Sequence, residues 1–309
     1  MASIVWGREV AEAYDAASAS MFDSAVLDPT VDLLAELARG GPALELAVGT
    51  GRVALPLSAR GVAVSGIELS PHMADQLRAK PGSEAVAVTI GDMTTTRVDA
   101  AFKLVCLVWN AIMNVTTQQE QVAVFRNAAG HLEPGGRFVV EVGVPEPHRR
   151  PPAELGRVFS LEDDHVGIDT YDDPVGQILS SHHWMEVNGH LVRHSAPYRY
   201  VWPSELELMG QLAGPGLAQR WRDGGRNRSR PTAPARWRCS RSPLSATYRP
   251  AQYHGQAPVR RLGYRRLSRR TFRAPVGVTT TDEERHDCAV TFGSRTDLVL
   301  RYRPDALTA

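Results

Sequence analysis

The chain has few cysteines and no long apolar run, and both absences restrict its class. Its three cysteines, Cys106, Cys239 and Cys288, are scattered, and none forms a CxxC pair. They cannot build a disulfide framework, a zinc motif or a redox motif. No run of about 18 apolar residues is available to cross a bilayer, and the N-terminal segment lacks the basic and apolar regions of a signal peptide. We therefore expect a cytoplasmic protein with no membrane partner.

Net charge is also almost absent. The 309 residues carry 35 Lys and Arg against 34 Asp and Glu, which leaves +1. A balanced chain has no overall electrostatic reason to bind nucleic acid or anionic lipid. The hydrophobic content of 43% with 22% charged residues is typical of a folded protein, which excludes disorder throughout. The length allows one large domain or two small ones.

One stretch lacks lysine altogether. Residues 216–275 contain sixteen arginines and a single acidic residue, Asp223, and their apolar positions follow neither a helical nor a strand period. Three explanations remain open: a basic arm that binds RNA, a solvated low-complexity linker, or a GC-rich segment translated out of frame. The absence of lysine favours the last, which predicts that another frame after residue 215 encodes a short strand pair and an early stop.

The region before this stretch has an alternating pattern. From Ala43 to Val144, short apolar runs alternate with helical segments, which is typical of parallel strands covered by helices on both faces. We predict an α/β fold with a Rossmann-like, doubly wound, mostly parallel sheet over residues 41–146, preceded by a helical lid over residues 1–40. The predicted helix starts are Asp28-Pro29, Ser70-Pro71, and Thr117 with its capping-box partner Glu120.

An antiparallel β insertion is expected after the fifth strand, over residues 147–215. Asn188-Gly189 separates two strand-like runs, and a two-residue turn there places His183 opposite His194. Ser204 and Glu207 are predicted to start a helix that ends at Gly214-Pro215. Residues 276–309 are expected to form a C-terminal hairpin or tail.

A glycine-rich turn carries the clearest chemistry. The first strand of the core runs into Gly49-Thr50-Gly51-Arg52, and the next strand ends at Glu68. With Ala54, this pattern fits a GxGxxA dinucleotide fingerprint, in which Glu68 would hold a ribose of NAD. It also fits the first motif of an S-adenosylmethionine site, in which Glu45 accepts from a cationic amino group. A carboxylate inside the normally apolar strand of an NAD site would be out of place.

Four further segments follow the glycine-rich turn. The five motifs extend from about Glu45 to Val142, in the order LELAVGTGR, GIELSPHM, GDM, LVWNAIMN and LEPGGRFVVEV. In their order and spacing the chain resembles the class I S-adenosylmethionine-dependent methyltransferases, of the small-molecule type found in actinobacterial secondary metabolism. It departs from that pattern at Ala47, where the family usually has glycine or cysteine, and at Lys103, where an acid is common.

The resemblance implies S-adenosylmethionine as cofactor and methyl transfer to nitrogen or oxygen of a small-molecule acceptor, in the biosynthesis of a natural product such as an antibiotic. An RNA methyltransferase using residues 216–275 and an NAD-dependent oxidoreductase are the alternatives. The oligomeric state stays open, a homodimer included. The implied cofactor-binding residues are Tyr14, Glu45, Ala47, Gly49, Gly51, Arg52, Glu68, Leu69, Met73, Asp92, Met93, Val108, Trp109 and Asn110.

By the resemblance, Tyr14 would contact the cofactor carboxylate and Met73 would flank the adenine. Asp92, at the end of the third strand, can accept from the adenine amino group. Tyr14 is equally compatible with an amphipathic helix packed on the core. Met73 and Trp109 are compatible with core positions as well.

Methyl transfer needs a nucleophile held at about 3 Å from the methyl group and in line with the breaking bond. An acceptor that loses a proton also needs a base, for which histidine is well suited at neutral pH. The candidates are His182, His183 and His194, with Glu141 in reserve. A solvent-exposed hairpin face is the competing explanation for the histidines.

The insertion also contains two acidic runs and several aromatic residues. Asp163 to His165 and Asp172-Asp173 are either metal ligands or turn residues, and the turn interpretation is favoured, so no metal is expected. Four aromatic residues are expected either to line a pocket or to pack on the core: Trp184, Tyr198, Tyr200 and Trp202.

Overall fold

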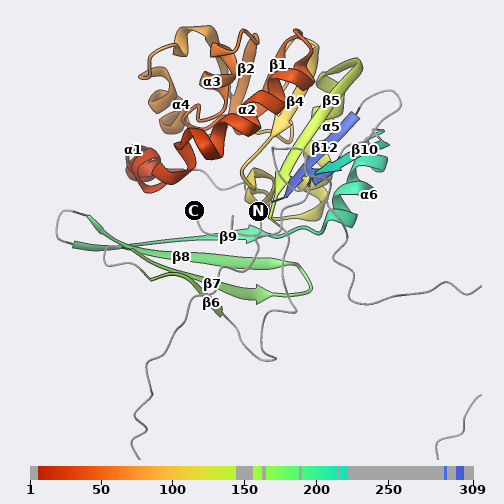
Figure 1. The fold of residues 1–309 in the computed structure, drawn as a ribbon. Coiled ribbons are helices and arrows are strands. Elements are labelled where there is room, and N and C mark those ends of the chain that lie inside the picture. The colour runs from red at the N-terminus through yellow and green to blue at the C-terminus, as the bar shows by residue number, and fades with distance from the viewer. Residues whose placement is uncertain are drawn as a thin grey trace, which may run out of the picture. The chain divides into compact units, whose positions relative to one another are not determined.

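The computed structural model describes residues 6–143, 156–161, 165–187, 190–214, 216–221, 289–290 and 297–302, and Figure 1 shows their arrangement. The helices are α1 (Arg8–Ala17), η1 (Ala19–Phe22), α2 (Ser24–Ala38), α3 (Ala54–Ala59), α4 (Pro71–Arg78), η2 (Ser83–Ala85), η3 (Ala111–Asn114), α5 (Gln118–His131) and α6 (Pro203–Ala213). The strands are β1 (Ala43–Leu46), β2 (Val64–Glu68), β3 (Val86–Ile90), β4 (Phe102–Leu107), β5 (Leu132–Val142), β6 (Gly156–Leu161), β7 (His165–Asp173), β8 (Ile178–Val187), β9 (His190–Arg199), β10 (Gly216–Trp221), β11 (Ala289–Val290) and β12 (Asp297–Tyr302).

The main sheet has the strand order β11-β10-β12-β5-β4-β1-β2-β3. Strands β1 to β5 run parallel to their neighbours, which confirms the predicted parallel core. Their order reverses at β1, which lies between β4 and β2. Open α/β sheets bind ligands at the carboxyl ends of the strands beside such a reversal.

Helices cover both faces of this sheet. On one face, Leu34 of α2 and Leu57 of α3 are fully buried against Leu104 of β4. On the other face, Phe125 of α5 contacts Phe138 of β5 edge to face, with ring centroids 5.2 Å apart. Burial on both faces explains why the central strands are mostly apolar, with Glu45 of β1 as an exception.

Two helix starts are confirmed in detail. The Ser70 side chain caps α4 by accepting the Met73 N–H at 3.2 Å. Thr117 and Glu120 form the predicted capping box of α5, in which the Thr117 N–H donates to Glu120 Oε2 at 3.2 Å. Both caps use local hydrogen bonds that the sequence alone specifies.

The predicted starts of two other helices were wrong by a few residues. Helix α2 begins at Ser24, so Pro29 lies inside it and not at its first position. Leu27 is buried against the core, and this burial extends the helix past the proline at the cost of one hydrogen bond. Helix α6 begins at Pro203, and Glu205, not Glu207, accepts the Trp202 N–H at 3.0 Å, because a proline favours the first helical position.

A second sheet follows the core in sequence. It contains β6-β7-β8-β9, in which every neighbouring pair is antiparallel. The predicted register is confirmed, with His183 opposite His194 and Val187 opposite His190. The Asn188-Gly189 turn itself lies outside the described residues. The antiparallel insertion is therefore present with the expected pairing.

The end of β9 joins this sheet to the core. Arg199 is 4% exposed, and its guanidinium donates to Gln121, to Gln177 Oε1 at 2.6 Å and to Glu205 Oε1 at 3.0 Å. Its backbone carbonyl accepts from Gln121 Nε2 at 3.1 Å. This buried network holds β9 against α5 and α6.

The last strands differ from the expected C-terminal hairpin. Strand β12 lies between β5 and β10 and runs parallel to both, while β11 pairs with β10, as the blue and teal strands beside β5 show in Figure 1. The open edge of β5 offers unpaired backbone groups to a further strand. Most of the arginine-rich stretch lies outside the described residues. No helix within the described ranges combines the length and hydrophobicity needed to cross a membrane.

Candidate active site

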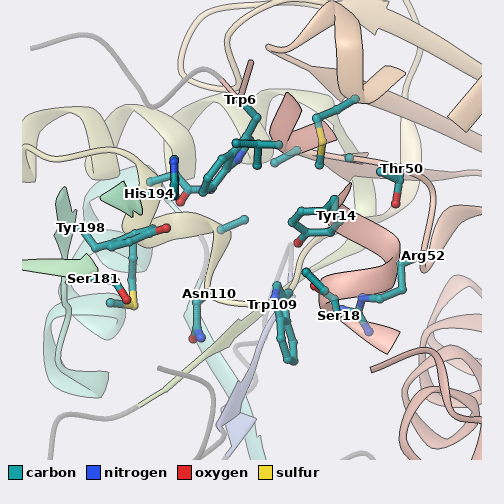
Figure 2. A pocket seen from close by; sticks show the side chains of 18 of the residues that line it. Trp6, Tyr14, Ser18, Thr50, Arg52, Trp109, Asn110, Ser181, His194 and Tyr198 are labelled. Atoms are coloured by element: carbon teal, nitrogen blue, oxygen red, sulfur yellow. The ribbon is translucent and has the colours of Figure 1, made fainter. Parts of the chain in front are cut away.

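A cavity of about 1160 Å³ lies at the carboxyl ends of the core strands. Its walls come from the N-terminal segment with α1, from the loops that follow β1, β2 and β4, and from one face of the four-stranded sheet. Figure 2 shows Tyr14, Arg52 and Trp109 on one side of it and Ser181, His194 and Tyr198 on the other. Pockets for one small ligand measure about 300–1,000 Å³, so this cavity lies just above the upper end of that range.

The loop after β1 forms part of the wall through unusual backbone angles. Ala47, Gly49 and Gly51 have φ values of 53°, 58° and 83°. The Gly49 N–H donates to Glu68 Oε2 at 2.9 Å, which joins this loop to the end of β2. A Cβ at position 51 would lie 2.9 Å from Leu77 Cγ. Glycine is therefore needed at Gly51, whereas Ala47 holds a left-handed conformation that glycine adopts more easily.

Two carboxylates are buried beside this loop. Glu68 accepts the Ser70 N–H through Oε1 at 2.9 Å as well as the Gly49 N–H, and burial raises its pKa against these donors. Glu45 is 3% exposed, and burial raises its pKa to about 8. Within the described part of the chain, Glu45 Oε2 has no hydrogen-bond partner. A buried acceptor on the cavity wall suits a ligand with a cationic donor.

The end of β4 carries a second unusual backbone segment. Trp109 and Asn110 have φ values of 57° and 56°, a conformation that costs a non-glycine residue about 1–2 kcal/mol. Asn110 Oδ1 accepts the Gly143 N–H at 2.5 Å, which stabilises the segment. The Trp109 ring lies under the Arg52 guanidinium, with 4.9 Å from Cζ to the ring centroid. The strained segment thereby places an aromatic face on the cavity wall.

The N-terminal segment covers the cavity from a third side. The Ser70 hydroxyl donates to the Trp6 carbonyl at 2.6 Å, and the Trp6 ring contacts the His194 ring with centroids 5.5 Å apart. Further along, Thr50 Oγ1 donates to Asp15 Oδ1 at 2.6 Å. Burial raises the pKa of Tyr14, which lines the cavity from α1. These contacts hold Trp6 and α1 against the cavity, while the helical lid over residues 1–40 stays a prediction.

The four-stranded sheet supplies the remaining wall. Alternate residues of β8 line the cavity, among them Ser181 and His183. His183 Nδ1 lies 3.0 Å from His165 Nε2, and the two rings stack at an interplanar angle of 8°. Burial, together with the neighbouring imidazoles of His165, His194 and His182, lowers the pKa of His183 to about 4. His183 is therefore a neutral imidazole at physiological pH.

Of the four candidate bases, His183 and His194 line the cavity and the other two lie elsewhere. His182 is on the opposite face of β8, where its Nδ1 lies 2.8 Å from Ser195 Oγ. Glu141 is buried in β5, and neither residue lines the cavity. Strand alternation places adjacent residues on opposite faces, so only one of His182 and His183 can face the cavity. The geometry favours His183.

Asp172 and Asp173 lie at the end of β7 and accept hydrogen bonds from nearby groups. Asp173 Oδ1 accepts the Val175 and Gly176 N–H groups at 3.0 Å and 2.9 Å, so it caps a turn. Asp172 accepts from the Thr170 and Ser180 hydroxyls. Asp163 lies outside the described residues. Among those that are described, no group of three or more His, Cys, Asp or Glu side chains is arranged for a metal ion.

The four aromatic residues lie in three different places. Tyr198 lines the cavity, and burial raises its pKa. Tyr200 and Trp202 pack on the hydrophobic core instead. Trp184 lies on the outer face of the sheet, with its ring centroid 5.4 Å from Arg193 Cζ. Only one of the four therefore forms the pocket.

Two comparisons with known proteins identify the family. Residues 43–136 match the family model of a methyltransferase domain. The CcbJ methyltransferase from Streptomyces caelestis is 32% identical, with a TM-score of 0.61, over 74% of this chain and 94% of that chain. This chain belongs to the S-adenosylmethionine-dependent methyltransferases. Family membership excludes the alternative of an NAD-dependent oxidoreductase, and the cofactor of this methyltransferase is S-adenosylmethionine.

Two more distant relatives are informative. The cypemycin N-terminal methyltransferase from a Streptomyces species is 26% identical over 212 residues, which are 68% of this chain and 86% of the relative. CalS10, an amino pentose methyltransferase from Micromonospora echinaspora involved in calicheamicin biosynthesis, is 21% identical with a TM-score of 0.52, over 71% of this chain and 93% of that chain. An identity of 21% shows only that this methyltransferase and CalS10 share a fold.

The cavity gathers most of the residues that the resemblance implied for the cofactor. All of them line it except Gly51, which instead lets the loop pack closely on Leu77 of α4. The buried Glu45 acceptor and the glycine loop fit a ligand that carries a cationic amino group. The assignment of individual contacts to the cofactor stays a prediction.

The sequence analysis did not predict several residues that line the cavity of this methyltransferase. Asp169, Ser181 and Phe159 line the cavity from three strands of the second sheet. The alternation that pairs His183 with Ser181 on one face of β8 was available as a signal. Nothing local indicated Trp6 or Thr50, whose contacts are long-range in sequence.

Proposed function

We propose that this chain transfers the methyl group of S-adenosylmethionine to nitrogen or oxygen of a small-molecule acceptor, as part of natural-product biosynthesis. The observation that carries the proposal is that one cavity joins the carboxyl ends of the core strands to the inner face of the four-stranded sheet. A core half and a sheet half provide separate walls for cofactor and acceptor.

The core half is proposed to hold the cofactor, which supplies an activated methyl group on a positively charged sulfur. Glu45 accepts from the amino group of the cofactor, Glu68 from its ribose and Asp92 from its adenine, with Tyr14 near its carboxylate. These roles are supported by the position of all four residues on the cavity wall and by the buried Glu45 oxygen.

The sheet half is proposed to hold the acceptor. Its lining combines a buried carboxylate, Asp169, with Ser181, His183, His194 and Tyr198. A carboxylate and several polar side chains on one wall suit a polar small molecule that is fixed by a few contacts. By their names, the cypemycin relative methylates an N-terminus and CalS10 methylates an amino pentose, and polar acceptors of these kinds support the proposal.

Calorimetric titration of the full-length protein with S-adenosylhomocysteine tests the cofactor half without knowledge of the acceptor. We expect a dissociation constant of about 1 μM, equivalent to about −8 kcal/mol, and no binding of NAD. Glu68→Ala removes the acceptor of the Gly49 and Ser70 N–H groups and should abolish binding. The matched control is Glu84→Ala, which removes an exposed carboxylate. Binding of NAD alone, or of neither ligand, contradicts the proposal.

The acceptor class is tested with tritiated S-adenosylmethionine. Amines and alcohols of natural-product size form one set of acceptors, and total cellular RNA forms the other. Label in a small molecule supports the proposal. Label only in RNA would support the alternative that uses residues 216–275.

A further inference from the structure

We propose that Ser181, His183 and His165 form a proton relay that carries the proton released by the acceptor atom away from the methyl-transfer site. The relay rests on the proposed function, because it serves an acceptor nitrogen or oxygen that loses a proton. Ser181 is the residue nearest the acceptor, His183 is the conductor and His165 is the terminal proton acceptor.

The three side chains form a continuous hydrogen-bonded row. Ser181 Oγ lies 3.2 Å from His183 Nε2, and His183 Nδ1 lies 3.0 Å from His165 Nε2. All three residues line the cavity. Each side chain therefore contacts the next through an atom that can donate or accept a proton.

The hydrogen-bonded row suits a neutral His183 imidazole. A neutral imidazole has one N–H group and one lone pair, so its two contacts point the same way along the row. We assign the Nδ1–H tautomer to the state before transfer, in which the Ser181 hydroxyl donates to Nε2 and the Nδ1–H group donates to His165 Nε2. A doubly protonated His183 would donate in both directions, and burial with neighbouring imidazoles opposes that form.

The proton balance of the transfer is complete. As the methyl carbon leaves sulfur and bonds to the acceptor atom, that atom loses its proton to Ser181 Oγ. Ser181 passes its own hydroxyl proton to His183 Nε2, and His183 passes the Nδ1 proton to His165 Nε2. His183 ends neutral in its other tautomer, and His165 ends as an imidazolium that returns the proton to water.

The surroundings of His183 explain why a relay is needed. The Phe159 ring lies edge-on to His183 with centroids 5.3 Å apart. Phe159 fits there because Gly167 has no side chain; a Cβ at that position would lie 2.2 Å from Phe159 Cε2. A histidine in this setting is too weak a base at neutral pH to keep the proton itself. The next atom able to take the proton is His165 Nε2, which lies 3.0 Å from His183 Nδ1.

The other ionisable groups on this wall do not join the row. His194 faces His183 from β9, and its ring contacts Trp6. Among the described residues, His194 Nε2 has no hydrogen-bond partner. Asp169 of β7 and Tyr198 of β9 also line the cavity, and His182 bonds on the outer face. The row therefore runs from β8 to the first residue of β7.

Nitrogen-15 NMR of the histidine-labelled full-length protein tests the row without any acceptor. We expect His183 to be neutral at pH 7, to share an N–H proton with His165, and not to titrate above pH 5. His165→Gln should remove the shared proton, and Ser181→Ala should shift only the Nε2 signal. The matched controls are His72→Gln on α4 and Ser180→Ala on the outer face of β8. A His183 that titrates near pH 6.5, or that shares no proton with His165, refutes the relay.

Activity separates failure of the relay from failure of the proposed function. Ser181→Ala and His165→Gln should each lower kcat about 100-fold, with unchanged affinity for S-adenosylhomocysteine. Their rates should recover as pH rises, because the acceptor then loses its proton to solvent. Equal kcat for Ser181→Ala and Ser180→Ala overturns the relay alone. No binding of S-adenosylhomocysteine by the parent protein overturns the proposed function instead.

Discussion

The buried carboxylate of Glu45 makes the stability of the cofactor-free protein depend on pH. In the folded protein its pKa is about 8, against an ordinary value of 4.5. Between these values the folded state keeps a proton that the unfolded chain has lost. The free energy of unfolding therefore falls by about 1.4 kcal/mol for each pH unit in this window, which amounts to about 3 kcal/mol between pH 4.5 and 7.

Glu45→Gln removes the ionisable group and keeps its shape. The difference in unfolding free energy between the variant and the parent should move in favour of the variant by about 3 kcal/mol from pH 4.5 to 7 and become constant above pH 8. Urea unfolding at a series of pH values measures this difference. Glu84→Gln, which changes an exposed carboxylate, is the control and should show no such dependence. A difference for Glu45→Gln that stays flat across the window would refute the reasoning.

The same substitution should weaken ligand binding. Loss of a hydrogen bond to a charged group costs about 1.5–3 kcal/mol, or roughly a 10- to 100-fold rise in the dissociation constant of S-adenosylhomocysteine. Ionisation of Glu45 on binding should also release a proton at pH 7, which calorimetry in buffers of different ionisation enthalpy detects. Together, these results predict that Glu45→Gln is more stable than the parent protein at neutral pH but binds S-adenosylhomocysteine more weakly.

Three further outcomes follow from single side chains. Ala47→Gly relieves a left-handed alanine and should raise the free energy of unfolding by up to about 1 kcal/mol in urea titrations; a loss of stability would contradict the assigned angle. Gly51→Ala adds both the left-handed strain and a contact with Leu77, so its unfolding free energy should fall by about 2 kcal/mol or more. Arg199→Met should cost about 3 kcal/mol at pH 7. Burial acts to raise the pKa of Glu205, but its hydrogen bonds, including the one from Arg199, lower it. The cost of Arg199→Met should therefore shrink as pH falls and Glu205 becomes protonated. An equal cost at pH 3 and pH 7 would argue against the ion pair.

Local signals predicted most of the fold. The capping box at Thr117 and the capped proline start at Ser70 depend on residues within one helical turn, so sequence spacing specifies them. The register that places His183 opposite His194 depends only on a two-residue turn. The glycine loop after β1 needs positive φ values that few other residues adopt. For such features the physical cause lies within a few residues of its effect.

Signals failed where packing overrides local preference. Leu27 is buried against the core, and α2 therefore extends on the N-terminal side of Pro29. The capping and proline preferences that predict helix starts do not include this tertiary contact. Strand β12 joins the open edge of β5 from far along the chain. In both cases the decisive energy comes from residues that are distant in sequence.

The sequence by itself determined the parallel core, the antiparallel insertion and the set of residues that gather at the carboxyl ends of the strands. It also determined that His182 and His183 lie on opposite faces of one strand. Only the tertiary structure decided which of the two faces the cavity, because alternation separates two faces without saying which one meets the core. The raised pKa of Glu45 and the contact between His183 and His165 also belong to the tertiary structure. Burial and hydrogen bonding arise from elements that only the folded chain brings together.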